Sequence, residues 1–273
     1  MTRLEEDPGN SRPIGIFDSG VGGLTVLRQL LRRLPSERMI YLGDTARLPY
    51  GTKSRETVVK YSLKNTSFLV EKGIKCLVVA CNTASSLALE ALRQAFPIPV
   101  LGVIQPGAER AARLTRNGRV GVIGTVATIR SRAYEEVIRT VESSIEVVSV
   151  PCPLFVSLAE EGWTQDEVTY LVAERYLEPL RKRDVDVLVL GCTHYPLLKS
   201  VISGIMGEKV RLVDSAEEIA VQVRNLLDQN GTRNAGRERC APKVYMTDSS
   251  PHFLELAQMI LSLPATEFEY VDL

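Results

Sequence analysis

Two cysteines occupy equivalent places in two similar stretches of the chain. Cys81 follows the largely apolar run 74–80, and Cys192 follows the similar run 185–191. Such runs are typical of buried strands, and each is followed by a segment with helical spacing. In parallel sheets the carboxyl ends of the strands bind ligands, and the start of the next helix favours a thiolate. Two thiols placed in this way could remove a proton from one face of a bound molecule and donate one to the other face.

Polar residues that could handle protons follow each cysteine directly: Asn82 and Thr83, and Thr193 and His194. Histidine is the usual partner for proton transfer near neutral pH, so His194 could lower the pKa of the Cys192 thiol or relay its proton. Asn82 and Thr83 could also cap the helix after Cys81. The structural alternative is that both cysteines are small buried side chains and that His194 only starts a helix. The equivalence of the two cysteine positions favours the chemical interpretation.

The other three cysteines lie elsewhere: Cys76, Cys152 and Cys240. We expect Cys76 and Cys152 to be packing residues and Cys240 to be incidental. The sequence contains no C-x-x-C pair, and His194 stands only two residues from Cys192, so their side chains point apart if this segment is extended. We therefore expect no metal site.

A glycine-rich loop, Asp18–Gly23 (DSGVGG), follows the first apolar run and precedes a helical segment. Its three glycines allow backbone amides to approach an anion, and the helix start adds its positive end. The order is not G-x-G-x-x-G and the P-loop lysine is missing, so the loop does not specify a nucleotide. A carboxylate is an alternative anion, with Asp18 at the loop mouth binding an ammonium group or acting as a base toward a thiol. In the structural alternative, Asp18 and Ser19 only cap the helix.

The elements that position these residues alternate along the chain. Short runs rich in Val and Ile predict strands at Pro13–Phe17, Met39–Leu42, Cys76–Ala80, Val100–Val103, Val120–Ile123, Ile145–Val150, Val185–Leu190 and Val210–Val213. Apolar positions three and four residues apart predict helices at Leu24–Leu34, Ser54–Lys72, Ala84–Ala95, Gly107–Leu114, Ser131–Val141, Thr164–Lys182, Tyr195–Ile205, Ala216–Leu227 and Pro251–Leu261. Nearly continuous apolar strands between helices predict an α/β fold with doubly wound parallel sheets.

The chain also contains an internal repeat, because Ile14–Ser19 aligns with Val120–Thr125, just as the two cysteine-bearing stretches align with each other. Two strand–loop pairs in the same order and at similar separation predict two similar domains. We expect a pseudo-two-fold axis to relate the domains and the active site to lie in the cleft between them. The predicted limits are 1–103, completed by 214–273, for the first domain and 104–213 for the second.

Length and charge exclude several classes of protein. The chain has 273 residues, in which 33 Lys and Arg balance 33 Asp and Glu. Zero net charge gives no long-range attraction to phosphate backbones or anionic lipids, so we expect no nucleic-acid or membrane partner. No window reaches the ~18 apolar residues of a membrane span, and acids at positions 5–7 stand where a signal peptide would be apolar. We therefore expect a cytoplasmic protein with free thiols.

Seven segments of the chain carry the motifs of one known family: Ile14–Val26, Tyr41–Ser54, Val78–Ser85, Leu101–Gly107, Val120–Thr128, Pro153–Gly162 and Val189–Pro196. Together they resemble the glutamate racemases, within the cofactor-independent aspartate/glutamate racemase superfamily. The resemblance implies racemisation by a thiol pair, Cys81 and Cys192, with Asp18 assisting Cys81 and with His194 and Glu160 assisting Cys192. It implies substrate contacts from Asp18, Ser19, Pro49, Tyr50, Gly51, Asn82, Thr83, Thr125, Thr193 and His194.

The same resemblance implies a homodimer that needs no cofactor and supplies D-glutamate for peptidoglycan. The turn Met246–Pro251 (MTDSSP) departs from the family pattern, so the sequence does not specify how the C-terminal segment packs. Removing an α-proton without a cofactor needs one thiolate and one thiol, and a helix start with polar neighbours could provide both states. Two other functions stay open: a racemase for aspartate or another amino acid of the same superfamily, and a non-catalytic two-domain protein that binds an anion or nucleotide at the glycine-rich loop.

Overall fold

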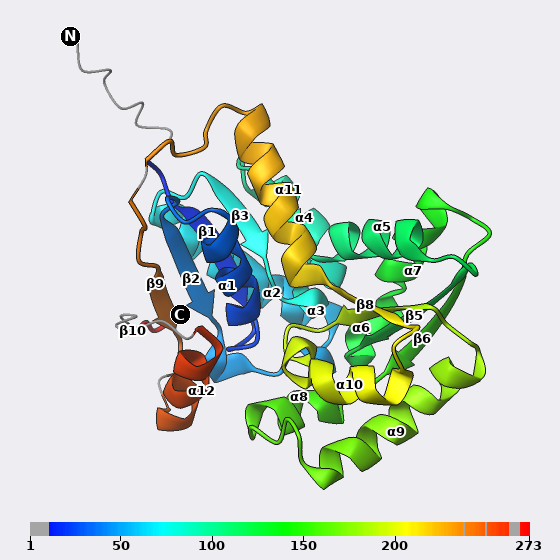
Figure 1. Cartoon of the computed structure of the whole chain (residues 1–273). Helices are drawn as coiled ribbons and strands as arrows, with labels where there is room; N and C mark the ends of the chain where they lie inside the picture. The colour runs from blue at the N-terminus through cyan, green and yellow to red at the C-terminus, as the bar shows by residue number, and fades with distance from the viewer. Residues whose placement is uncertain (1–10, 237, 249, 262–267) are drawn as a thin grey trace.

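The strands of the chain form two separate parallel sheets (Figure 1). The computed structural model describes residues 11–236, 238–248, 250–261 and 268–273. Residues 1–10, where the sequence predicts no signal peptide, lie outside the described part. One sheet has the strand order β10-β9-β2-β1-β3-β4, and the other has the order β6-β5-β7-β8. We call the six-stranded sheet with its helices the first lobe and the four-stranded sheet with its helices the second lobe.

All eight predicted strands are present: the inner strands are buried on both faces, whereas β6 and β8 lie at the edges of their sheet and are partly exposed. The strands are β1 (Ile14–Asp18), β2 (Met39–Gly43), β3 (Cys76–Val79), β4 (Val100–Gly102), β5 (Arg119–Gly124), β6 (Glu146–Pro151), β7 (Val187–Gly191), β8 (Arg211–Asp214), β9 (Lys243–Met246) and β10 (Phe268–Tyr270). The sequence prediction missed β9 and β10, which are short and extend the first sheet beyond β2.

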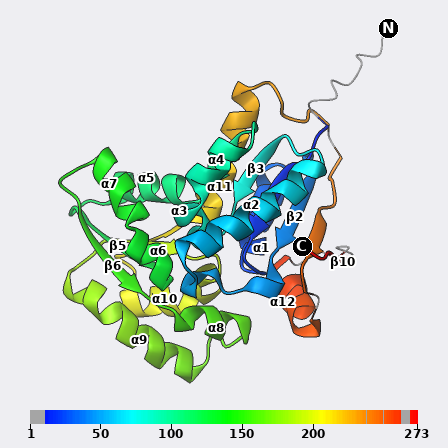
Figure 2. The same ribbon diagram turned by 180° about the vertical axis from the view of Figure 1, so that it is seen from behind.

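Helices cover both faces of each sheet (Figures 1 and 2). In the first lobe α1, α11 and α12 pack on one face and α2, α3 and α4 on the other. In the second lobe α8, α9 and α10 pack on one face, and α5 and α7 on the other. The helices are α1 (Leu24–Arg33), α2 (Arg55–Glu71), α3 (Asn82–Leu87), α4 (Leu89–Ala95), α5 (Ile104–Leu114), α6 (Val126–Ser131), α7 (Ala133–Val141), α8 (Leu154–Glu160), α9 (Glu167–Lys182), α10 (Lys199–Met206), α11 (Ser215–Gln229) and α12 (Pro251–Leu261).

Three helix predictions need correction, and the short helices α6 and α8 were not predicted. The predicted helix 195–205 is a 3₁₀ turn (Tyr195–Leu198) followed by α10. The predicted helix 84–95 is two helices, because the chain leaves helical geometry at Ala88 (φ −116°, ψ −11°). The predicted helix 131–141 begins only at Ala133, since Arg132 adopts a left-handed conformation (φ 58°) that ends α6. Helix α8 follows Pro153. Short helices carry too few turns for a periodic apolar pattern to reveal them.

The internal repeat is visible in the order of the strands. In the first lobe β1 to β4 lie in the order β2-β1-β3-β4, and in the second lobe β5 to β8 lie in the matching order β6-β5-β7-β8. The predicted fold class, two similar doubly wound parallel sheets, is therefore confirmed. The domain limits 1–103 with 214–273, and 104–213, stay a prediction.

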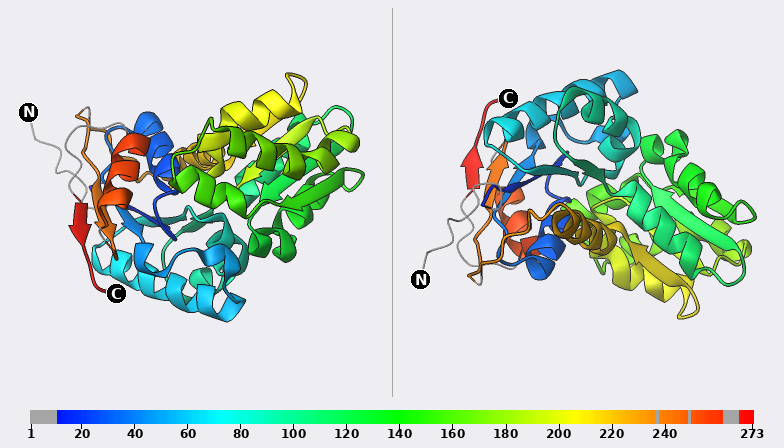
Figure 3. Two further views of the ribbon diagram at one scale, coloured as in Figure 1. Left: turned by 90° about the horizontal axis from the view of Figure 1, so that it is seen from below. Right: turned by 90° about the horizontal axis from the view of Figure 1, so that it is seen from above.

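The two lobes lie side by side (Figure 3). The chain passes from the first lobe to the second between β4 and α5, and it returns between β8 and α11. Four strands have a neighbouring strand on both sides: β1, β3, β5 and β7. The residues that follow them are therefore held in place by the interior of each sheet. Within the described ranges, no helix is long and apolar enough to cross a membrane.

Candidate active site

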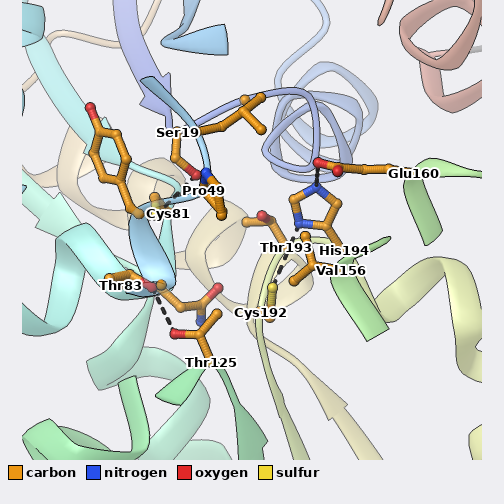
Figure 4. Close-up of a pocket in the computed structure, with 15 residues that line it drawn as sticks. Ser19, Pro49, Cys81, Thr83, Thr125, Val156, Glu160, Cys192, Thr193 and His194 are labelled. Atoms are coloured by element: carbon orange, nitrogen blue, oxygen red, sulfur yellow. Dashed lines mark hydrogen bonds and ion pairs between the residues drawn. The ribbon is translucent and has the colours of Figure 1, made fainter. Parts of the chain in front are cut away.

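A narrow pocket lies between the two lobes, beside the carboxyl ends of β1, β3, β5 and β7 (Figure 4). Both lobes contribute to its wall, which consists of Ser19, Gly20, Leu48, Pro49, Tyr50, Gly51, Cys81, Asn82, Thr83, Thr125, Val156, Glu160, Cys192, Thr193 and His194. Every site residue named from the sequence is in this wall except Asp18. Leu48 and Val156 were missed, because an apolar wall residue carries no chemical signal in a sequence. Gly20 was not named singly, but it belongs to the glycine-rich loop that the sequence analysis singled out.

Cys81 comes from the first lobe and starts helix α3. It is itself the N-cap residue, so the prediction that Asn82 or Thr83 caps this helix is wrong. The Cys81 sulfur accepts a hydrogen bond from the Ala84 amide at 3.4 Å, and its thiol donates to the Ser19 hydroxyl oxygen at 3.6 Å. The side chain is 5% exposed.

Burial determines the protonation of Cys81. Desolvation raises the pKa of its thiol to about 12, and the charge of Asp18 adds to the shift. The hydrogen bond from the Ala84 amide opposes the shift but is outweighed. The amide at the helix start lowers the pKa of this thiol, as expected, but the loss of solvation by water raises the pKa by more. In this closed arrangement Cys81 holds its proton.

Cys192 comes from the second lobe and has an imidazole as its partner. Its sulfur lies 3.6 Å from His194 Nδ1, and His194 Nε2 lies 3.1 Å from Glu160 Oε1 (Figure 4). The expectation that an extended segment turns the side chains of Cys192 and His194 apart is wrong. β7 ends at Gly191 and His194 has helical backbone angles (φ −82°, ψ −30°), so the chain turns the imidazole back onto the sulfur.

The surroundings of His194 favour its charged form. Burial lowers the pKa of the imidazole, but hydrogen bonds to Cys192 and Glu160 and the negative charge of these groups outweigh burial and raise the pKa well above its usual value. Glu160 is the last residue of α8, and its side chain is 18% exposed at the edge of the cavity. The Cys192 sulfur therefore faces an imidazolium, which stabilises negative charge on a neighbouring atom.

Asp18 lies beneath the cavity wall rather than at the loop mouth where the sequence placed it. Its Oδ2 accepts hydrogen bonds from the amides of Gly20 and Gly23, both at 3.0 Å, and the Thr193 hydroxyl donates to its Oδ1 at 3.3 Å. Complete burial raises the pKa of this carboxyl, while His194 and these hydrogen bonds oppose the shift. Two amides of the glycine-rich loop thus bind a carboxylate of the protein itself, which leaves fewer amides for a bound anion.

Polar side chains connect the lobes around the cavity. The hydroxyl oxygens of Thr83 and Thr125 are 2.9 Å apart, and the Asn82 amide donates to the Tyr134 hydroxyl at 2.8 Å. Tyr134 was not predicted as a site residue, because its position in an amphipathic helix marks it only as core. The lobes are closed on each other at these contacts, and Asn82, Thr83 and Thr125 line the same cavity as the two thiols.

The two sulfurs therefore line one cavity, and they differ in their partners. Cys81 is a protonated thiol near a buried carboxyl, whereas Cys192 faces the His194–Glu160 pair. No group of three or more His, Cys, Asp or Glu in the part of the chain that the structure describes is placed to hold a metal ion. An acid and a base on opposite lobes can exchange protons with a molecule bound between them.

The chain is similar in sequence and in structure to known proteins of one family. The family described as Asp/Glu/Hydantoin racemase matches residues 14–223. The chain is 57% identical over 250 residues to a protein named glutamate racemase from Geobacter metallireducens, covering 92% of this chain and 93% of that protein. It is similar to the crystal structure of a glutamate racemase isoform from Bacillus anthracis (TM-score 0.93, 39% identity, 97% of this chain and 98% of that one). It is also similar to a glutamate racemase from Francisella tularensis in complex with D-glutamate (TM-score 0.90, 39% identity, 96% and 98% covered).

Proposed function

Because the chain belongs to the Asp/Glu/Hydantoin racemase family, we propose that it interconverts L- and D-glutamate by moving the α-proton between two cysteines. The observation that carries the proposal is that Cys81 and Cys192, one from each lobe, face a single cavity. The Geobacter and Bacillus relatives are both named glutamate racemases, which supports glutamate as the substrate.

The proton transfer proceeds in two steps. The Cys192 thiolate, next to the His194 imidazolium, takes the α-proton from one face of the substrate and becomes a thiol. The resulting carbanion then takes the proton of the Cys81 thiol on the opposite face, which leaves Cys81 as a thiolate. The opposite enantiomer reacts by the same steps in reverse, and exchange with water restores the starting protonation. Each half-reaction needs one base and one acid, and in this proposal a cysteine from each lobe supplies them.

The polar wall residues have a different task, which is to stabilise the negative charge that spreads from Cα onto the substrate carboxylate. Hydroxyl and amide groups fixed in advance stabilise such charge better than mobile water does. The residues placed for this role are Ser19, Asn82, Thr83, Thr125 and Thr193. Asp18 acts indirectly in this proposal: it holds the loop that carries Ser19 and, through its charge, keeps the proton on Cys81.

Deuterium incorporation tests the proposal directly. Either enantiomer of glutamate, incubated with the protein in D2O without added cofactor, should gain deuterium at Cα and lose its optical rotation. Proton NMR follows the exchange and circular dichroism follows the racemisation. If neither enantiomer exchanges, the protein is not a racemase of glutamate.

Cysteine variants test which groups carry the proton. Cys81→Ser and Cys192→Ser should each lower kcat/KM by about 10²–10⁴-fold, the usual contribution of one positioned acid or base. Cys240→Ser is the control, because this half-buried sulfur donates only to the Ser36 carbonyl oxygen and does not line the cavity. Wild-type turnover in either of the first two variants would contradict the two-cysteine mechanism.

Two alternatives are distinguished by further measurements. For a racemase of aspartate, kcat/KM would be higher with aspartate than with glutamate. For a non-catalytic anion-binding protein, phosphate or nucleotides would bind while the thiols stay inert to alkylation. The engagement of the Gly20 and Gly23 amides by Asp18 weighs against the second alternative.

We further infer that the product D-glutamate supplies peptidoglycan synthesis, as the sequence resemblance implies. The homodimer and the cytoplasmic location stay predictions. Sedimentation of the purified protein at several concentrations tests the first, and fractionation of cells tests the second.

A further inference from the structure

Asp44 is a buried carboxylate that the proposed mechanism does not use. It follows β2 directly, it is 0% exposed, and its amide donates to the carbonyl oxygen of Asp18 at 3.0 Å. Burying a carboxylate is unfavourable unless its oxygens receive hydrogen bonds. The partners of Asp44 therefore indicate what the carboxylate holds in place.

The two oxygens of Asp44 bind different parts of the chain. Oδ2 accepts a hydrogen bond from the Tyr50 hydroxyl and lies 3.4 Å from the Asn65 amide nitrogen, which also donates to Tyr50 at 3.1 Å. Oδ1 accepts from the Thr247 hydroxyl at 3.1 Å. Tyr50 is part of the cavity wall, whereas Thr247 follows β9 in the C-terminal segment. Asp44 thus connects a residue of the cavity to a residue far away in sequence.

Thr247 binds the loop after β2 at more than one point. Its hydroxyl also accepts a hydrogen bond from the Ala46 amide at 3.0 Å, and its own amide donates to the Gly43 carbonyl oxygen at 3.1 Å. Next to it, the Asp248 amide donates to the Thr45 hydroxyl at 2.7 Å. Thr247 and Asp248, in a stretch whose packing the sequence does not specify, therefore bind the segment that leads to Pro49, Tyr50 and Gly51.

We infer that Thr247 is a positioning residue, which holds the cavity wall at residues 48–51 in its substrate-binding position by way of Asp44 and Tyr50. The inference rests on the proposed function. Valine has nearly the shape of threonine but removes the donor to Asp44 and the acceptor for Ala46, whereas serine keeps both. The loss should loosen the wall, which contacts substrate, and leave the two thiols and their partners unchanged.

The test compares Thr247→Val and Thr247→Ser in the racemase assay. Thr247→Val should raise KM for both enantiomers by about tenfold, because a buried charged acceptor loses its donor, while kcat changes by less than about threefold. Thr247→Ser should restore the wild-type KM. Thr140→Val is the matched control, since this exposed hydroxyl donates only to the Glu136 carbonyl oxygen of its own helix.

A second variant keeps the inference testable if Thr247→Val does not fold. Tyr50→Phe keeps the ring in the wall and removes only its hydroxyl, so it should raise KM in the same way. If both single variants fold, the double variant should raise KM by less than the product of the two single effects, because both act through Asp44.

Several outcomes would overturn the inference while the proposed function stands. They are a folded Thr247→Val variant with wild-type KM, a fall in kcat without a change in KM, a serine variant as impaired as the valine variant, or independent effects in the double variant. If the wild-type protein does not racemise glutamate, the proposed function fails instead. The inference is then tested by calorimetric titration of both proteins with glutamate. The Kd of Thr247→Val for glutamate should be about tenfold higher than that of the wild-type protein.

Discussion

Replacing Glu160 by glutamine removes the negative charge next to His194 and keeps the size of the side chain. The His194 Nε2 atom lies 3.1 Å from Glu160 Oε1, and Glu160 is one of the two groups that raise the pKa of this imidazole above its usual value. In the proposed mechanism the imidazolium stabilises the Cys192 thiolate. The variant should therefore lose activity at a pH where the wild-type protein is still active.

The size of the effect follows from the contact. A hydrogen bond between two charged groups contributes about 1.5–3 kcal/mol, which corresponds to about one to two pKa units. The Glu160 side chain is 18% exposed, so water screens part of its charge and the lower value applies. Since the imidazolium exists only below the pKa of His194, the alkaline fall in kcat/KM should begin about one pH unit lower in the variant.

The assay is the pH dependence of kcat/KM, measured by circular dichroism from both enantiomers. Because L- and D-glutamate have equal free energies, kcat/KM must change equally in the two directions, which checks the data internally. At a pH above the shifted limb, Glu160→Gln should be about tenfold less active than the wild-type protein, and the two should converge as the pH falls.

Glu161→Gln is the matched control, because this neighbouring carboxylate is exposed and does not line the cavity. Its pH profile should equal that of the wild-type protein. An alkaline limb that does not move in Glu160→Gln, or that moves to higher pH, would refute the assignment of His194 as the charged partner of Cys192.

Two further predictions concern the close contact of the lobes at Gly51 and the buried ion pair of Glu37. In Gly51→Ala the new Cβ would lie 2.7 Å from Thr125 Cβ of the other lobe, so the lobes cannot close fully and kcat/KM should fall by at least about tenfold. Gly204→Ala is the control, because no atom lies within 4 Å of the new Cβ. It should keep full activity, and its free energy of unfolding in urea should rise by about 0.5–1 kcal/mol. Equal activity of the two variants would show that closure at Gly51 is unimportant. Glu37→Gln should lower the free energy of unfolding by about 3–5 kcal/mol, because it breaks the buried pair of Glu37 with Lys75 (2.6 Å), and an unchanged urea midpoint would contradict this.

Much of the framework was predictable from the sequence because it depends on local apolar patterns. Strands rich in Val and Ile form apolar runs, so all eight strands of the repeated units were found, and the repeat placed Cys81 and Cys192 at equivalent strand ends. α8 was missed because it is short. β9 is as long as β3, but it begins with Lys243 and follows a polar segment, so it is not part of an apolar run. Glu160, at the end of α8, was identified only through the family resemblance.

The sequence by itself determined which groups reach the site, and only the tertiary structure decided their state and their partners. The sequence placed a thiol at the start of a helix, but the pKa of Cys81 rises because the closed lobes remove it from water. It placed Asp18 before three glycines, but the fold determines that the amides of two of them, Gly20 and Gly23, bind Asp18 itself. Thr247 meets Asp44 only because β9 pairs with β2. Local patterns fix the order of elements, whereas desolvation and hydrogen-bond partners depend on which distant segments pack together.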